Sequence, residues 1–217
     1  MDLGQLLIDG LHLEPPAVLA LVGGGGKTTL MRAAHAEGLG RGWTVVAGTT
    51  TKVYARQAAD LPGFLHGGAV ADKLTGVTDD VVRDAAATFD LAVVEADGSR
   101  SKVVKAPARH EPVIPTCATH VVALIGADAL DRVIEDVAHR PMLVGAVCGC
   151  SPYGRLTVER AARLLTDPER GAAKGVPGGA RFAVAITRIG PAQQRLADEL
   201  TALLAGHGVT AIQLPVR

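Results

Sequence analysis

Four consecutive glycines followed by a lysine and two threonines, at positions 23–29, are the residues of this chain best suited to bind phosphate. They follow an apolar run, Ala17–Val22, that predicts a buried strand, and they precede a segment with helical periodicity. Glycines let the backbone turn tightly against phosphate oxygens, and the N-terminus of the following helix attracts the same anion. Lys27 can then reach the terminal phosphates, and the Thr28 hydroxyl can bind Mg²⁺. The residues predicted to bind a nucleotide are Gly23, Gly24, Gly25, Gly26, Lys27, Thr28 and Thr29.

This loop is shorter than the common phosphate-binding loop. The common pattern has a glycine six residues before the lysine, and here that position is Leu21. The chain instead reads Gly23-x-x-Gly26-Lys27-Thr28, a spacing that resembles the ATP loop of the Mur ligases. A flexible glycine linker is the alternative, but a linker has no need of Lys-Thr-Thr beside its glycines. We therefore favour phosphate binding.

Two carboxylates mark the end of the third predicted strand. Residues 90–96 form a largely apolar run that contains Glu95, and Asp97 and Gly98 follow it. Residues two apart on an extended strand share a face, so both acids should point the same way. Proteins with a phosphate-binding loop keep a Mg²⁺-binding carboxylate at such a strand end. We predict that one acid holds the metal while the other orients water or a hydroxyl, and that Asp97 lies at metal-bridging distance from Thr28.

A third polar group, Thr49–Lys52, follows the second predicted strand. Thr50 can bind Mg²⁺ or the terminal phosphate, and Lys52 can neutralise charge during transfer; the competing interpretation is a β-prone threonine tail on a strand. The carboxyl ends of parallel strands meet at one edge of a sheet, where α/β proteins bind ligands. The metal ligands that we expect are Thr28, Thr50, Glu95 and Asp97, and the catalytic residues that we expect are Lys27, Lys52, Glu95 and Asp97.

The segment 101–115 comes soon after the acidic pair and carries mixed charge with three prolines. An ordinary solvated loop is one interpretation of this composition. Its length, its prolines and its position favour a loop that covers a substrate. The side chains expected to contact a substrate are Lys105, Arg109, His110 and Glu111.

The rest of the chain alternates strand and helix patterns, which predicts an α/β fold like that of P-loop NTPases, with a doubly wound, mostly parallel sheet and helices on both faces. Further strands are expected at residues 44–48, 120–126, 181–187 and 209–214. Helices are expected at residues 1–13, 28–38, 78–89 and 157–165, with shorter helical pieces at 127–137 and before residue 147. Pro191 is expected to open a last helix that runs to residue 205, and residues 57–76 are expected to be mostly loop.

Composition excludes several classes of protein. Of the 217 residues 48% are apolar but only 3% aromatic, so the core must be aliphatic, as in parallel sheets buried on both faces. Acidic and basic residues balance at 22 each, which provides no field to attract nucleic acid or an anionic membrane. No stretch approaches the ~18 apolar residues of a membrane span, and the N-terminus lacks the pattern of a signal peptide. We expect a cytoplasmic protein whose residues 1–217 form one domain.

The chain has three cysteines, Cys117, Cys148 and Cys150, too few for a disulfide framework. The close pair Cys148-Gly-Cys150 can hold a metal or a chalcogen, but it lacks the second pair of a structural zinc site. We expect buried free cysteines.

Several of these stretches together resemble one known family. The motifs GGGGKTT, TTTK, VVEADGS, KAPARHEPVIP, THVVALIGADAL and HRP are similar to those of the selenium-dependent molybdenum hydroxylase accessory proteins, the YqeC family, over roughly residues 18–188. The resemblance implies a nucleotide-binding protein that assists the maturation of molybdenum hydroxylases carrying selenium, with such a hydroxylase or its cofactor as partner. It adds His139 and Arg140 to the residues expected to bind a substrate or partner, and it also covers Gly171 and Lys174–Gly175.

The chain departs from these relatives after the fifth predicted strand. Relatives often have Asn-Lys followed by an acid there, a pattern that reads guanine, whereas this chain has Thr187-Arg188-Ile189-Gly190. Without the acid, the guanine amine and ring N–H lose their partner, so we expect ATP with Mg²⁺, and GTP as the alternative. Two other functions stay open: an ATP-dependent small-molecule kinase or ligase whose acceptor binds the 105–115 loop, and a non-catalytic nucleotide-binding scaffold.

Overall fold

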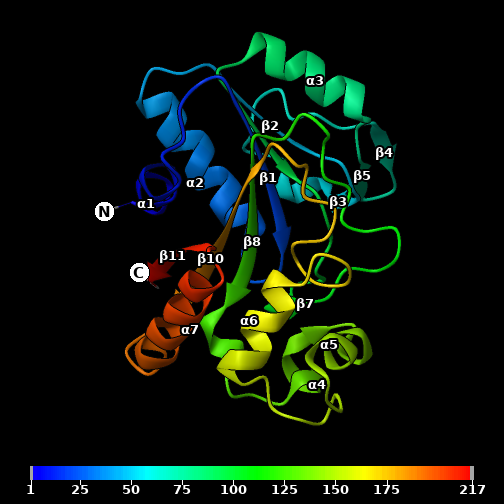
Figure 1. The fold of residues 1–217 in the computed structure, drawn as a ribbon. Helices are drawn as coiled ribbons and strands as arrows, with labels where there is room; N and C mark the ends of the chain where they lie inside the picture. Colours follow the sequence, from blue (N-terminus) through cyan, green and yellow to red (C-terminus); the bar gives the residue numbers. More distant parts are fainter. Residues whose placement is uncertain (1, 216–217) are drawn as a thin grey trace.

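The computed structural model describes residues 2–215 and is built around a six-stranded parallel sheet with strand order β11-β10-β8-β1-β6-β2 (Figure 1). The strands are β1 (Ala17–Gly23), β2 (Val45–Thr49), β6 (Leu91–Glu95), β8 (His120–Gly126), β10 (Arg181–Ile189) and β11 (Thr210–Pro215). Every residue of β1, β2, β6 and β8 is buried, as expected for parallel strands covered on both faces. The predicted doubly wound α/β fold is confirmed.

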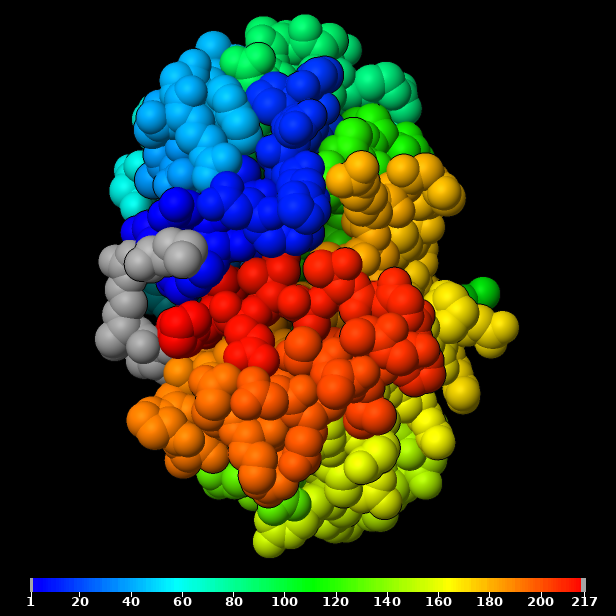
Figure 2. All heavy atoms as spheres, turned by 60° about the vertical axis from the view of Figure 1, so that its left-hand side comes forward, coloured from blue at the N-terminus to red at the C-terminus, as the bar shows by residue number. Residues whose placement is uncertain are grey.

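Helices cover both faces of this sheet. One face carries α1 (Leu3–Leu11) and α2 (Lys27–Gly40), whose apolar side chains share a core with the sheet. The core of the other face includes side chains from α3 (Asp79–Thr88), α5 (Pro141–Cys148), α6 (Val158–Thr166) and α7 (Gln194–Gly206). Helix α1 also packs beside β11, so the N-terminal and C-terminal elements lie side by side (Figure 2).

Two small sheets flank the central one. In the first, β3 (Val53–Tyr54), β5 (Lys73–Thr75) and β4 (Gly68–Val70) pair antiparallel, next to a 3₁₀ turn η1 (Ala55–Gln57). Residues 57–76 were predicted to be mostly loop, because strands of only two or three residues are too short to show a clear alternation of apolar and polar side chains. In the second, β7 (Val104–Lys105) pairs in parallel with β9 (Ala138–His139).

The ends of some helices differ from the prediction. Helix α2 continues through Gly38, where a Cβ would lie 2.8 Å from the Val45 side chain, so this glycine serves close packing and does not end the helix. Helix α7 begins at Gln194, one turn after Pro191. The predicted helical piece at 127–137 is a 3₁₀ turn η2 (Ala127–Ala129) followed by the four-residue α4 (Ile134–Val137).

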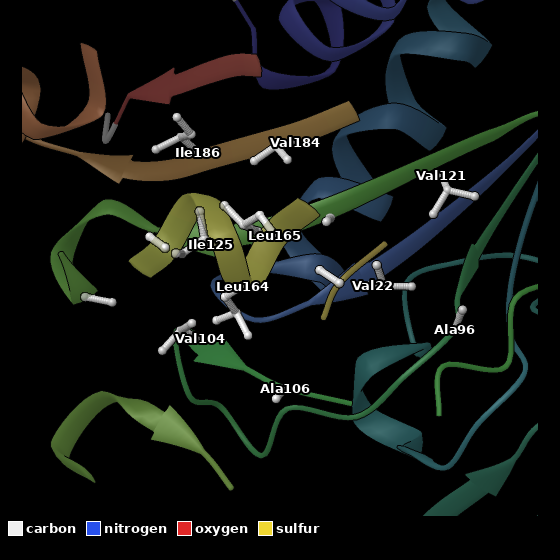
Figure 3. Close-up of a cluster of buried hydrophobic side chains, with 14 of the residues drawn as sticks. Val22, Ala96, Val104, Ala106, Val121, Ile125, Leu164, Leu165, Val184 and Ile186 are labelled. Atoms are coloured by element: carbon white, nitrogen blue, oxygen red, sulfur yellow. The ribbon is translucent and has the colours of Figure 1, made fainter. Parts of the chain in front are cut away.

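The segment after the acidic strand end is anchored in the core. Figure 3 shows Val104 close to Leu164 of α6 and Ile125 of β8, within the apolar cluster of this face. Because Val104 and Ala106 are buried there, the chain between β6 and β8 is held against the carboxyl edge of the sheet. No helix in the described part of the chain is long and apolar enough to span a bilayer.

Candidate functional site

The glycine loop joins the end of β1 to the start of α2. Three of its residues have backbone angles that favour glycine, since φ is 90° at Gly23, 98° at Gly25 and 123° at Gly26. A Cβ on Gly24 would lie 2.6 Å from the Lys102 carbonyl oxygen, so the segment after β6 covers the loop there. A Cβ on Gly26 would meet nothing within 4 Å, so the loop is open where α2 begins. The opening lies at the helix N-terminus, where free N–H groups favour an anion.

Thr28 contacts one of the two predicted acids. Its hydroxyl donates to Glu95 Oε1 at 2.6 Å and accepts from Gln57 Nε2 at 2.9 Å. Glu95, the last residue of β6, is buried, and this burial raises its pKa, against the opposing effects of the Lys27 charge and the Thr28 hydrogen bond. The structure therefore pairs Thr28 with Glu95, whereas the sequence analysis placed Asp97 there.

Asp97 instead lies between two lysines. Its Oδ2 accepts the Gly23 N–H at 2.9 Å and lies 3.2 Å from Lys105 Nζ, and its Oδ1 lies 3.0 Å from Lys27 Nζ. The contact with Lys27 is an ion pair without hydrogen-bond geometry, and Lys27 directs its hydrogen bond to the Gly23 carbonyl at 2.6 Å. Only 5% of Lys27 is exposed, so this lysine is held inside an ionic cluster and does not face solvent.

A second ionic group continues from Lys105 to the molecular surface. Lys105 Nζ donates to Glu111 Oε2 at 2.7 Å, and Arg140 donates to both Glu111 oxygens at 2.6 and 3.2 Å. Burial alone would raise the pKa of Glu111, but the hydrogen bonds from Arg140 and Lys105 lower this pKa to about 2. Lys174 donates to the carbonyl oxygens of Ala108, Arg109 and Glu111, which fastens this stretch of chain. The expected substrate-covering loop is thus fixed by ionic contacts in this structure.

Several predicted residues lie outside these contacts. The Thr50 hydroxyl donates to the Val113 carbonyl at 2.6 Å and lies 3.4 Å from the Glu95 carbonyl oxygen, so it is turned toward the backbone. Lys52 is exposed and, within residues 2–215, makes no hydrogen bond or ion pair. Arg109 and His110 are exposed as well, whereas His139 is half-buried in β9. Burial lowers the pKa of His139, and the positive charge of Arg140 lowers it further.

Two contacts at the glycine loop have no signal in the sequence. Gln57 reaches Thr28 from the 3₁₀ turn η1, and its orientation is set by the Tyr54 N–H, which donates to the amide oxygen at 2.9 Å. Thr187 at the end of β10 donates to the Gly25 carbonyl at 2.7 Å. Both residues join Thr28 or Gly25 from distant parts of the sequence, so no local spacing could reveal them.

The end of β10, where the sequence analysis looked for guanine recognition, has a glycine at position 190. Arg188 follows Thr187 with φ 57° and lies 3.3 Å from Asp128 Oδ2, and position 190, where the family resemblance led us to look for an acid, is a glycine. The Asp128 carboxylate comes from the turn after β8, on the same side of the sheet.

The residues beside the loop fit a magnesium ion. A hydroxyl oxygen from Thr28 and a carboxylate oxygen from Glu95 are ligands of the kind that Mg²⁺ prefers, with water and phosphate oxygens completing its shell. Within residues 2–215 no three His, Cys, Asp or Glu side chains gather into a metal site of their own. The three cysteines are free as expected, but only Cys148 is buried, whereas Cys117 and Cys150 are half-buried. Burial, with a smaller contribution from Cys150, raises the pKa of Cys148 to about 12, which keeps its thiol protonated.

Comparison with known proteins places the chain in a family. The YqeC protein family model matches residues 19–142, more than half of the chain. The chain is 32% identical over 241 residues to protein YqeC of Escherichia coli K12, an alignment that covers 99% of this chain and 93% of that protein.

Two solved structures were also found. The hydrogenase maturation factor HypB of Archaeoglobus fulgidus superposes with a TM-score of 0.45 at 10% identity, over 98% of this chain and 86% of that one. The signal recognition particle receptor FtsY of Elizabethkingia anophelis superposes with a TM-score of 0.48 at 15% identity, over 97% of this chain and 62% of that one. On the family match and the sequence identity, this chain belongs to the YqeC family.

Proposed function

We propose that this protein binds a nucleoside triphosphate with Mg²⁺ and hydrolyses it, with ATP as the nucleotide. The observation that carries the proposal is the meeting of Lys27 and Thr28, at the start of α2, with the acids Asp97 and Glu95, at the end of β6. An open glycine loop, a lysine, a hydroxyl and a buried carboxylate at one sheet edge are the groups that phosphoryl transfer uses.

Thr28 and Glu95 would hold the metal, directly or through water, and the metal would neutralise charge on the phosphates. The chain's own part is to present loop N–H groups to the phosphates and to move Lys27 from the Gly23 carbonyl onto them. Asp97 stays paired with Lys105 when Lys27 leaves, so the buried carboxylate keeps a counter-ion. Glu95 accepts the hydrogen bond of the Thr28 hydroxyl at 2.6 Å, which keeps that hydroxyl oriented at the start of α2.

The biological role that we propose is that of an accessory protein in the maturation of selenium-dependent molybdenum hydroxylases, as the family resemblance implies. A partner or its cofactor would contact the surface beside the ionic group of Lys105, Glu111 and Arg140, where Arg109, His110 and His139 also lie. Transfer of the phosphoryl group to a small acceptor at this surface is the second candidate. It is favoured by the position of this ionic group, which adjoins Asp97 directly.

Binding and product analysis test the proposal. Titration calorimetry with ATP and Mg²⁺ should give binding that weakens about tenfold, ~1.4 kcal/mol, in Thr28→Val. Thr88→Val, which removes an exposed hydroxyl at the end of α3, should bind like the wild type. Release of free phosphate with no modified acceptor supports hydrolysis, and a phosphorylated or adenylated acceptor supports the second candidate. Binding without any turnover would reduce the protein to a nucleotide-binding scaffold.

A further inference from the structure

The turn after the acidic pair carries an arginine in an unusual backbone conformation. The Lys102 N–H donates to the Ser99 carbonyl at 3.0 Å, so residues 99–102 form a four-residue turn. Its two central residues, Arg100 and Ser101, have φ values of 49° and 61°. Turns with two positive φ angles favour glycine, asparagine and aspartate at these positions, and arginine is not among them. Such strain persists where the surrounding structure imposes it, and it is common at functional sites.

Both ends of this turn are fastened to the glycine loop. On the near side, Asp97 accepts the Gly23 N–H at 2.9 Å. On the far side, the Lys102 carbonyl packs against Gly24 so closely that a Cβ there would lie 2.6 Å from the oxygen. The turn between these two anchors therefore lies beside the loop that is proposed to hold the phosphates, which fixes the position of the Arg100 backbone.

Within the described residues, no side chain or backbone group pairs with the Arg100 side chain. It is exposed, and within residues 2–215 it makes no hydrogen bond or ion pair. Its charge nevertheless acts on its surroundings, since burial lowers the pKa of His139 and the neighbouring cations, Arg100 among them, lower it further. A free guanidinium among other positive charges is a group that an incoming anion would engage.

We propose that Arg100 is a catalytic residue of the hydrolysis, where its guanidinium donates hydrogen bonds to the oxygens of the transferred phosphoryl group. This role rests on the proposed function. In the reaction, a water oxygen forms a bond to the γ-phosphorus, and the bond from that phosphorus to the bridging oxygen breaks. The bridging oxygen keeps the electron pair, and the proton of the water passes to the released phosphate. Arginines that neutralise the charge of this transition state raise the rate by about 10³- to 10⁵-fold.

Three variants separate the side chain from the strained backbone. Arg100→Ala removes the guanidinium, and Arg100→Gly removes it while adopting a positive φ without strain. Arg181→Ala is the matched control, because this exposed arginine lies at the amino end of β10, on the opposite edge of the sheet from the loop. Each variant is assayed for hydrolysis of ATP with Mg²⁺, and of GTP in a parallel series. Binding of ADP with Mg²⁺ is measured with and without aluminium fluoride, which mimics the transferred phosphoryl group.

Both Arg100 variants should lower kcat on the order of 10³-fold while changing the Kd of ATP by less than about threefold. They should also lose the tighter ADP binding that aluminium fluoride produces, and Arg181→Ala should keep it. Values of kcat within about threefold of the control would overturn the catalytic role, as would loss in Arg100→Ala but not in Arg100→Gly. If the wild type turned over neither nucleotide, the proposed function itself would fall, and the role of Arg100 with it.

Discussion

Glu95 and Asp97 are separated by one residue, yet the structure gives them opposite electrostatic surroundings. Glu95 ends β6 against a hydroxyl, that of Thr28, and its burial raises its pKa. Asp97 lies two residues further on, between Lys27 and Lys105, with the Gly23 N–H on its second oxygen. The site therefore has one carboxylate whose hydrogen-bond partner is a neutral hydroxyl and one that is paired with two lysines. A metal ion would complete the first, whereas the second already stabilises the fold.

The different surroundings of Glu95 and Asp97 should have their largest effect on the stability of the protein without nucleotide. Asp97→Asn leaves the buried Lys27 ammonium without its paired carboxylate and leaves Lys105 with Glu111 alone, and breaking a buried ion pair in this way costs about 3–5 kcal/mol. For a protein of this size that lowers Tm by roughly 10 °C. Glu95→Gln serves as the matched variant, and thermal unfolding without nucleotide should leave it level or slightly more stable. Equal losses in both variants would remove the distinction.

Nucleotide affinity should depend most on Lys27. Lys27→Ala is expected to weaken ATP binding with Mg²⁺ by about 100-fold, ~2.7 kcal/mol, because the phosphates lose a charged donor. The fold should survive, since Asp97 keeps Lys105 and the Gly23 N–H as partners. Titration calorimetry measures the change, with Lys73→Ala in the small antiparallel sheet as control. Wild-type affinity in Lys27→Ala would remove the glycine loop from the nucleotide site.

The dependence of ATP affinity on Mg²⁺ should be affected more by the loss of Glu95 than by the loss of Asp97. Glu95→Gln is expected to reduce the gain in ATP affinity that Mg²⁺ provides by about tenfold, ~1.4 kcal/mol, since the Thr28 site loses the carboxylate of Glu95. Asp97→Asn should keep most of that gain at a temperature where it is still folded. Binding isotherms with Mg²⁺ and with EDTA measure it. If Asp97→Asn lost the Mg²⁺ dependence and Glu95→Gln kept it, the metal ligand would be Asp97.

The pH dependence of stability gives a smaller effect of known sign. Because the folded-state pKa of Glu95 is raised, the protonated form is favoured by folding, and this contribution is present at low pH and lost as pH rises through that pKa. The stability of the wild type relative to Glu95→Gln should therefore increase as the pH is lowered from 7 toward 5. Denaturant unfolding at several pH values measures it. A difference that does not change with pH would mean that Glu95 titrates normally.

The smallest effect is expected for the preference between ATP and GTP, which we assign to the end of β10, away from both acids. With Gly190 in place of an acid, ATP should bind at least as tightly as GTP under identical Mg²⁺ and salt. Competition between the two nucleotides measures the ratio. A preference of about tenfold for GTP, ~1.4 kcal/mol, would contradict this and make Asp128, the partner of Arg188, the residue to replace next.

Local sequence was sufficient for the central elements of this protein. A buried apolar run, a glycine turn and Lys-Thr define the strand, the loop and the helix start through short-range backbone preferences and hydrophobic periodicity. The same reasoning located Glu95 and Asp97 at one strand end, and the alternation of strands and helices predicted the parallel sheet. These features depend on residues within a few positions of one another, so they can be read without the fold.

Which side chains contact one another at the site was decided only by the tertiary structure. The alternation of side chains between the two faces of a strand ends at Glu95, because β6 ends at that residue. The orientation of the Asp97 side chain is therefore set by its contacts with Lys27, Lys105 and the Gly23 N–H. Lys105 is buried because β7 pairs with β9, more than thirty positions along the chain, and Gln57 reaches Thr28 from a turn between β3 and β4. These contacts join distant segments whose own sequences are short and mixed in character. Their pairing is fixed by the packing of the whole sheet edge, which no local pattern encodes.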